Sequence, residues 1–441
     1  MVPHPASLLG AFLAALFCSL VSVAQPMVGQ APAGSVALTL GAAEARLEQG
    51  NREIIAARQE LEVTRTGVIS AGARPNPVLS TSITSINPVR GIGGGPIKDK
   101  QVDSVVRLDQ LIERGGKREL RIASAEHSVA AAEQDLQEVR RQQRLALHLT
   151  YYDLKAAGER LAISRENSRQ QAQALQAAER RLTAGDVAAA EVVRLRVEAL
   201  RADNEAGVAA SDLVRSRQAL AMLLGGDRGP AEAWQAADAW PADLPGLPGS
   251  ADAAARLEDP ETVAQRPGVR AAQFRVAAAE RARELARQLR TRDISVGAQV
   301  ERFPPEAGLS YGVSISVPLQ TNYRYEGEIA RAEADLTAAM LARDREAMLA
   351  LSEARRALSE AQAAAERRTR LATEILPQAR RVLESAEFAY QRGAIGLLDL
   401  LDARRTLRIV ELEAAGAAAD FARARAGWIA ATAGPAAAAM R

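Results

Sequence analysis

Two aspartates at helical spacing are the residues whose types most directly suggest chemistry. Asp399 and Asp402 follow the glycine at position 393 in a segment of helical pattern, and side chains three residues apart share one face of a helix. Two carboxylates on one face attract cations, although most such pairs on helices are simply solvated. The corresponding residues of an earlier, similar segment are Glu191 and Arg194, which we expect to neutralise each other. The residues alone leave both interpretations of the acidic pair open.

Other chemistry-bearing residues do not form a site. His127 and His148 are too far apart in sequence for the spacing of a metal pair, so we interpret them as solvated or seam histidines. Gly115–Arg118 imitates the end of a phosphate-binding loop, but Leu111 replaces its first glycine and Arg118 replaces the magnesium-binding Ser or Thr. We interpret it as a strand-to-helix turn with its cations near membrane headgroups. No catalytic residue, metal site or cofactor is predicted, and we expect no enzyme activity.

Composition indicates which elements position these residues. Hydrophobic residues make up 48% of the 441 residues, but aromatic residues only 3%, so Ala, Leu and Val supply most of the apolar content. Such a composition is typical of coiled coils and long helices rather than of layered α/β enzymes. The 56 basic and 54 acidic residues leave a net charge of +2. This balance argues against a nucleic-acid partner, which requires a concentrated positive excess.

The first residues resemble a secretory signal. An apolar run over Leu8–Val23 is short for a membrane-crossing helix and ends in small residues, which predicts a signal peptide over residues 1–24 and cleavage before Gln25. Cleavage would remove Cys18, the single cysteine, so no disulfide framework or cysteine-based metal site is expected. Lipidation of Cys18 is the alternative, although Phe17 stands where such signals require a small residue. No later segment is apolar enough for a transmembrane helix, so any membrane crossing must use β-strands.

The remaining chain is predicted to contain one structural unit twice. Arg121–Glu126 returns as Glu328–Glu333, and Thr183–Val187 corresponds to Gln391–Ile395, at offsets of about 207 and 208 positions. Each copy is expected to consist of a helix, two strands, a very long helix, a glycine turn and a return helix. The predicted divisions are the first copy at 36–226, a Pro/Gly-rich linker at 227–256, the second copy at 257–434 and a tail at 435–441.

The long helices carry a heptad repeat. Lys117–Ala184 contains no proline and one glycine, so a continuous helix there would be about 100 Å long. Pro377 is expected to bend the second long helix one or two turns before the Gly393 turn. Residues at intervals of seven form the predicted coiled-coil seam: Leu147, Leu154, Leu161, Ser168, Leu175 and Leu182 on the first long helix, and Val192, Ala199, Ala206, Leu213 and Leu220 on its return helix. Shifted by 208 positions, the return-helix set becomes Leu400, Leu407, Ala414, Phe421 and Trp428.

Four strands interrupt this helical pattern. Apolar and polar residues alternate in three segments, while Val78–Ile86 is a weaker, Ser/Thr-rich partner. Runs of about ten residues suit tilted membrane strands with one apolar face, but half-buried hairpins packed on the helices remain an alternative. Four strands cannot close a barrel, so a membrane-spanning form must oligomerise. The predicted membrane-facing residues are Val102, Val106, Leu108, Ile294, Val296, Val300, Tyr311, Val313, Ile315 and Val317.

Particular segments resemble the TolC family of outer-membrane channels. The matching stretches are Ala386–Arg405, with the sequence AEFAYQRGAIGLLDLLDARR, its first-copy counterpart AERRLTAGDVAAAEVVRLR, and IERGGKRELR at 112–121. The resemblance implies a homotrimer in the outer membrane of a Gram-negative bacterium, with a helical extension through the periplasm. The implied fold class is mainly α with a membrane β-barrel contribution: duplicated long-helix coiled-coil hairpins plus four β-strands per chain, forming a trimeric α/β barrel.

The same resemblance implies roles for the two glycine turns and the acidic pair. Asp399 and Asp402 match aspartates that line the constricted channel entrance, here called the gate. Ile395 stands where the compared family member has a gate Arg, so a closed state locked by that Arg is not expected. The turns are expected to form the tip where a periplasmic adaptor protein docks, through Gly185, Asp186, Val187, Gly393, Ala394 and Ile395.

The resemblance also indicates partners and a cargo. The GGKR turn is similar to that of outer-membrane components of cobalt, zinc and cadmium efflux systems, so metal cations are the favoured cargo. The expected partners are the adaptor, an inner-membrane efflux pump driven by protons, and outer-membrane lipid. Type I secretion and drug efflux are alternatives within the same fold. A soluble periplasmic coiled-coil scaffold is the alternative from another class, and an adaptor is disfavoured because no lipoyl-like β-domain is recognisable.

Overall fold

The computed structural model describes residues 36–96, 99–226, 233–242, 263–304, 306 and 308–432. These residues belong to one structural unit. The predicted signal peptide with Cys18, most of the linker predicted at 227–256, and the tail at 435–441 lie outside them.

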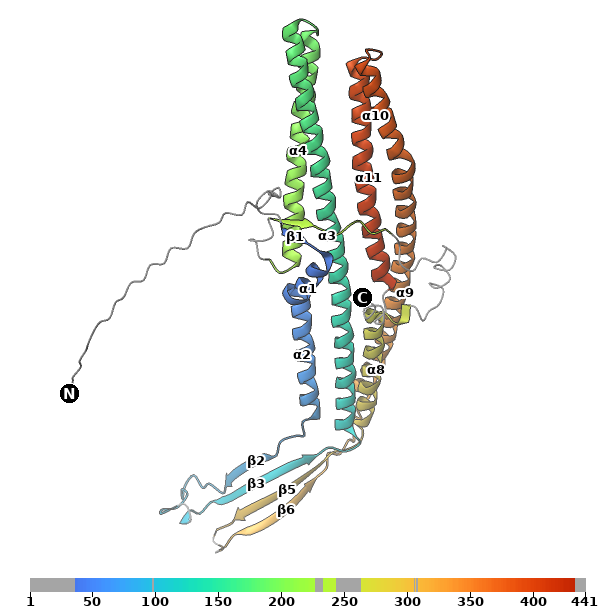
Figure 1. Ribbon diagram of the computed structural model, residues 1–441. Coiled ribbons are helices and arrows are strands. Elements are labelled where there is room, and N and C mark those ends of the chain that lie inside the picture. The colour runs from blue at the N-terminus through green and yellow to red at the C-terminus, as the bar shows by residue number, and fades with distance from the viewer. Residues whose placement is uncertain are drawn as a thin grey trace, which may run out of the picture. The chain divides into compact units, whose positions relative to one another are not determined.

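The same order of elements occurs twice along the chain (Figure 1). The first copy comprises α1 (Leu40–Gly50), α2 (Arg52–Gly72), β2 (Val78–Thr84), β3 (Asp103–Ile112), α3 (Lys117–Ala184) and α4 (Ala189–Leu223). The second comprises α8 (Pro267–Gln288), β5 (Ile294–Arg302), β6 (Ser310–Ser316), α9 (Glu326–Arg370), η2 (Leu371–Ile375), α10 (Leu376–Gln391) and α11 (Leu397–Thr432). Helix α3 contacts α2, α4, α8 and α11, so it packs against helices of both copies.

Helix α3 runs without interruption over the 68 residues predicted for it. It begins after Gly116 in the left-handed conformation and ends at Gly185, which is also left-handed. The predicted seam becomes more exposed toward Gly185, since Leu147 and Leu154 are buried whereas Leu182 is exposed. Return-helix seam residues are buried in both copies, among them Val192, Leu213, Leu220, Leu400, Phe421 and Trp428.

The second long helix is interrupted directly before Pro377, the residue at which the sequence predicts the bend. A π-helical turn, η2, separates α9 from α10, and Pro377 lies in the first turn of α10. Proline has no N–H to donate and its ring clashes with the preceding turn, and a π-turn is one way in which a helix absorbs such a disruption. Because α10 spans 16 residues, the break lies about four turns before Gly393 rather than one or two.

The four strands form one antiparallel sheet in the order β2-β3-β5-β6. The central pair joins the two copies, with Ile112 opposite Ile294 and Val106 opposite Val300. Val102 and Val317 do not belong to strands, which corrects two of the predicted positions. Val102 is buried in the loop before β3. The β5–β6 ladder ends at Ser316, and Pro318, two residues later, has no N–H to donate to a ladder.

A short linker segment ties the first copy together. Strand β4 (Trp234–Ala236) pairs in parallel with β1 (Val36–Leu38), and Trp234 is buried in the core with α1, α3 and α4. The hydroxyl of Tyr151 on α3 donates to Asp238, with 2.7 Å between oxygens, and Asp238 accepts the backbone N–H of Leu40 at 2.6 Å.

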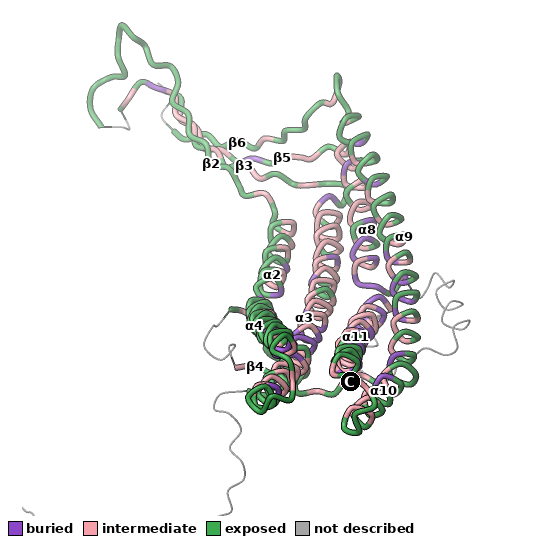
Figure 2. The backbone as a smooth tube through the Cα atoms, turned by 90° about the horizontal axis from the view of Figure 1, so that it is seen from above, coloured by how far each residue is buried: buried purple, intermediate pink, exposed green. Residues whose placement is uncertain are grey.

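Burial is concentrated on the helices, as Figure 2 shows, whereas β2 is exposed along its whole length and β6 along most of it. None of the described helices combines the length and apolar character needed to traverse a bilayer.

Candidate functional site

The two glycine turns have the same hydrogen-bond pattern. At the first, the N–H of Gly185 donates to the Leu182 carbonyl and the next N–H donates five residues back, at 3.0 and 2.9 Å. At the second, Gly393 and Ala394 make the equivalent bonds, both 2.9 Å. Both glycines have positive φ, 85° and 71°, and this pairing is the Schellman ending that favours glycine because it lacks a Cβ. A Cβ at either glycine would meet nothing within 4 Å.

The predicted docking residues beside the glycines are largely accessible. Asp186 and Ala394 are exposed, while Val187 and Ile395 are partly buried. Val187 packs at the edge of a small apolar cluster that includes Ala178. The turns therefore present polar and small residues outward over an apolar base.

Asp399 and Asp402 are both exposed on α11. The Asp399 carboxylate accepts the N–H of Gly396 at 3.1 Å, which is half of a capping box and stabilises the start of the helix. Leu397 and Leu401, on another side of the same turns, pack against the first-copy cluster. The helix is thus fixed by its leucines, and its acidic pair remains on an accessible face.

Equivalent ion pairs lie behind both turns. Arg196 pairs with Glu179 at 2.8 Å, and Arg404 pairs with Glu387 at 3.0 Å, 208 positions later in each case. Each pair connects a return helix with the helix that precedes the turn. The expected neutralisation of Glu191 by Arg194 is wrong for the described structure, which contains no ion pair between them.

The tips of the two copies also touch. Arg181, near the end of α3, donates to the Tyr390 hydroxyl on α10 at 3.3 Å. Farther from the turns, Arg408 on α11 pairs with Glu205 on α4. These contacts place both turns at the same end of the helices, as Figure 1 also shows.

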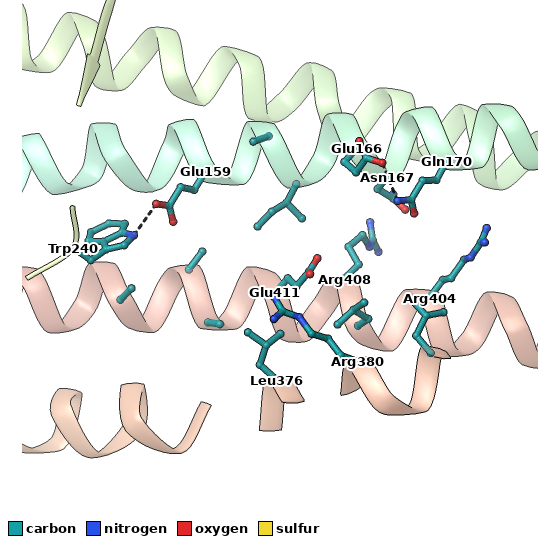
Figure 3. A pocket seen from close by; sticks show the side chains of 17 residues that line it. Glu159, Glu166, Asn167, Gln170, Trp240, Leu376, Arg380, Arg404, Arg408 and Glu411 are labelled. Carbon is teal, nitrogen blue, oxygen red and sulfur yellow. Dashed lines mark hydrogen bonds between the residues drawn. The ribbon is translucent and has the colours of Figure 1, made fainter. Parts of the chain in front are cut away.

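A cavity of about 580 Å³ lies between the copies, some distance behind the turns. Figure 3 shows glutamates and amides of α3 on one side and charged residues of α10 and α11 on the other. Trp240 lies at one end, where its Nε1–H donates to Glu159 at 2.7 Å. The lining contains no cysteine, histidine or serine.

The two histidines do not meet. His148 is buried, with its Nε2 2.7 Å from a carboxylate oxygen of Glu44 on α1, while His127 is partly buried elsewhere on α3. Within the described ranges, no three His, Cys, Asp or Glu side chains are grouped as a metal site requires.

The sheet presents one exposed apolar face. The register aligns Leu79, Leu108, Ala298 and Val313 across the four strands, and it aligns Val106 with Val300 and Tyr311. The alternate residues, including Ser80, Arg107, Gln299 and Gly312, form the other face. Exposed apolar residues of this face include Leu79, Ile83, Val106, Leu108, Val296, Val300, Tyr311, Val313 and Ile315, and the predicted Ile294 is partly buried at the β5 end.

The GGKR turn has a different role from the one expected for its lysine. Lys117 is buried, and its Nζ donates to both carboxylate oxygens of Asp293, at 2.8 and 2.9 Å, and to the Thr291 carbonyl at 2.7 Å. Its charge is therefore neutralised inside the protein and does not reach headgroups. Gly115 has φ 73°, a left-handed conformation that favours glycine at this turn.

A second, partly buried charge network was not predicted from the sequence. Arg141 pairs with Glu138 at 2.6 Å and approaches Glu353 of the second copy at 3.6 Å, while Arg266 pairs with Glu353 at 2.7 Å. The spacing of Glu138 and Arg141 could have suggested their pairing. Glu353 carried no such signal, because its partners come from distant parts of the sequence.

The family described as outer membrane efflux protein matches residues 45–226 and 260–434, and the chain belongs to this family. The TolC-family resemblance is thereby confirmed.

Individual relatives support the same class. The cobalt-zinc-cadmium resistance protein CzcC of Cupriavidus metallidurans is 31% identical over 188 residues, covering 43% of this chain and 42% of that protein. The match thus spans less than half of this curated relative. Solved structures with the same fold include the outer-membrane channel OprN, with 23% identity, a TM-score of 0.70 and 90% of each chain covered. They also include CusC, with 18% identity, a TM-score of 0.73 and 92% and 95% coverage.

Proposed function

We propose that this chain is the outer-membrane exit channel of a tripartite efflux system. In this proposal three copies assemble, and their twelve strands form a closed sheet through the outer membrane. The helices extend into the periplasm, where the turns at Gly185 and Gly393 dock a periplasmic adaptor. An inner-membrane pump, proton-driven, supplies the cargo.

The exposed apolar face of the sheet carries this proposal. It runs across all four strands, with polar residues on the opposite face. Such alternation matches a strand with lipid on one side and water on the other. The outer strands β2 and β6 each pair with one neighbour among the described strands, and unpaired strand edges are not tolerated in lipid. Other copies of the chain would pair these edges.

Metal cations are the cargo we propose. The match to CzcC, a cobalt-zinc-cadmium resistance protein, supports this cargo over the drug and type I secretion alternatives. A passive duct needs no cargo-specific ligand, so the cavity and helices need not contain a metal site. Three copies of Asp399 and Asp402 around a threefold axis would line the gate with six carboxylates, and acidic rings favour cations.

A growth experiment tests which cargo the channel exports. Cells lacking the chain would be complemented with the wild type or an empty vector, and growth would be measured in cobalt, zinc and cadmium and in uncharged organic antibiotics. We expect complementation to restore metal tolerance selectively. Restored antibiotic tolerance with unchanged metal tolerance would favour drug efflux and overturn the proposed cargo.

Fractionation, detergent dependence and cross-linking test whether the chain is a membrane-integrated trimer. We expect it to fractionate with outer membranes, to require detergent, and to cross-link to about three times the mature mass. A monodisperse monomer in plain buffer would instead support the soluble scaffold.

A further inference from the structure

Five exposed arginines lie at the edge of the sheet that faces the helices. Strands β2 and β5 begin at this edge, and β3 and β6 end there, because neighbouring strands are antiparallel. The chain segments connecting this edge to the helices form what we call the junction band, residues 72–77, 113–117, 289–293 and 317–325. The arginines of the band are Arg74, Arg114, Arg290, Arg292 and Arg324.

Hydrogen bonds hold the four segments of the band together. Lys117 joins the second segment to the third through Asp293 and the Thr291 carbonyl. Arg118 donates to the carbonyl of Gly72 at 2.6 Å, which attaches the first segment. Arg290 donates to the carbonyl of Arg324 at 3.3 Å, which attaches the fourth. The arginines are therefore held at one level of the molecule, between the apolar sheet and the helices.

The acidic residues of the band are already neutralised by other groups. Asp293 accepts from Lys117 and from the backbone N–H of Arg114, and Glu113 pairs with Arg121. Among the ion pairs of the described residues, none involves the guanidinium of Arg74, Arg114 or Arg292. Glu326 accepts the Arg324 backbone N–H at 2.9 Å and lies within the electrostatic influence of Arg290 and Arg324. The band consequently keeps an excess of exposed positive charge.

Two tyrosines lie at the same level. Tyr323 is half exposed, and its ring centroid is 6.0 Å from that of Tyr325. Tyr325 has φ 63°, a left-handed conformation, and caps α9 just as Gly116 with φ 66° caps α3 in the first copy. Glycine adopts this conformation without strain, whereas tyrosine does not. A strained position occupied by an aromatic ring points to a function for that ring.

We infer that the junction band binds the phosphate groups of anionic phospholipids in the leaflet nearest the helices. This inference rests on the proposed membrane function. Guanidinium groups bind phosphate oxygens through paired N–H donors, and tyrosines favour the boundary between hydrocarbon and water. The apolar face of the sheet begins directly beyond the arginines, so bound headgroups would fix how deeply the sheet sits.

The test uses the full chain in detergent with added lipid. Thermal unfolding would be followed after adding phosphatidylglycerol, phosphatidylcholine or inorganic phosphate. We expect phosphatidylglycerol to raise the Tm of the wild type more than phosphatidylcholine does, because ligands that bind the folded state stabilise it. Arg114→Gln combined with Arg292→Gln should lose at least half of that additional shift. Arg201→Gln combined with Arg356→Gln removes the same charge from exposed helix positions and should keep it.

Tyr325→Gly tests the contribution of the tyrosine with a substitution that should not destabilise the fold. Its Tm without lipid should equal or exceed that of the wild type, because the strain is relieved, while its Tm increase with phosphatidylglycerol should be smaller. If this variant keeps the full Tm increase with phosphatidylglycerol, Tyr325 does not contribute to lipid binding. Three results would each overturn the lipid assignment. They are an equal Tm increase of the wild type with both lipids, an undiminished phosphatidylglycerol response in Arg114→Gln/Arg292→Gln, and the same Tm increase with inorganic phosphate.

Vesicle flotation separates this inference from the proposed function. A chain that floats with vesicles of either lipid but shows no preference between them fails only the headgroup inference. A chain that floats with neither fails the membrane proposal itself.

Discussion

Lys117 and Asp293 form a buried ion pair that joins the two copies of the chain at the edge of the sheet. The Nζ of Lys117 lies 2.8 Å from Asp293, and the lysine side chain is only 7% exposed. Removing one partner leaves an unpaired charge away from water, so Lys117→Met should destabilise the protein by about 3–5 kcal/mol. Thermal unfolding in detergent would measure the loss. Lys117→Met combined with Asp293→Leu should recover part of it, and no recovery would mean that packing rather than charge explains the effect.

Substitutions of Gly185 and Gly393 should be tolerated when the new residue readily adopts a left-handed backbone and should be destabilising when it does not. Gly185→Val and Gly393→Val place a β-branched residue at positive φ, which costs about 1–2 kcal/mol at each position. If the turns dock an adaptor, the double variant should lose metal tolerance in cells while its cross-linked trimer persists. Gly185→Asn with Gly393→Asn is the matched control, because asparagine adopts this conformation more readily. Unchanged tolerance in the valine variant would exclude the turns as the docking site.

The acidic pair should control cation passage if it lines the gate. Single-channel currents in planar bilayers would be recorded with divalent cations added on the helix side. Block should be strong in the wild type and largely absent in Asp399→Asn/Asp402→Asn, because the carboxylates that attract cations are gone. Asparagine at 399 still offers an oxygen to the Gly396 N–H. The control Asp203→Asn changes an exposed acid on α4 and should leave the block unaltered. Equal block in all three proteins would mean that Asp399 and Asp402 lie on an ordinary solvated face and not at the gate.

If the apolar face of the sheet contacts lipid, an arginine substitution should be harmful on that face and tolerated on the polar face. Val313 on β6 is 80% exposed on the apolar face, and Ser82 on β2 belongs to the polar face. Arginine on a lipid-facing strand position costs about 2–4 kcal/mol near the bilayer centre. Val313→Arg should therefore reduce the amount of folded protein in outer membranes, whereas Ser82→Arg should not. A reversed order would assign lipid to the other face.

Glu138 should make stability depend on pH. Burial by itself raises the pKa of Glu138, but the hydrogen bonds and charge of Arg141 outweigh burial and hold it below the ordinary value of 4.5. A carboxyl with a lowered folded pKa stabilises the fold above its unfolded pKa, and that contribution is lost as pH falls through the folded pKa. The Tm difference between wild type and Glu138→Gln should thus be largest near neutrality and shrink below about pH 4.5. Glu62→Gln, in an exposed pair with Arg65, should show little difference at any pH.

Local patterns in the sequence determined the elements. The absence of proline over Lys117–Ala184 is enough to predict α3, and glycines at 185 and 393 mark turns because their left-handed backbone is unfavourable for other residues. Heptad and alternating patterns indicate which faces are apolar, since side-chain direction repeats with the local geometry of helix and strand. Pro377 correctly marks the break in the second long helix, but the π-helical form of the turn before it was not predicted, because a proline specifies a disruption and not the geometry that absorbs it.

Only the tertiary structure decided which charges meet. Lys117 looked like a surface cation in sequence, but the pairing of β3 with β5 brings it to Asp293 and buries it. Glu191 and Arg194 have the spacing of a pair, yet Arg196 and Glu179 pair instead across two helices. Ion pairs and burial depend on residues that are distant along the chain, and a local pattern specifies which face a side chain occupies but not what lies opposite it.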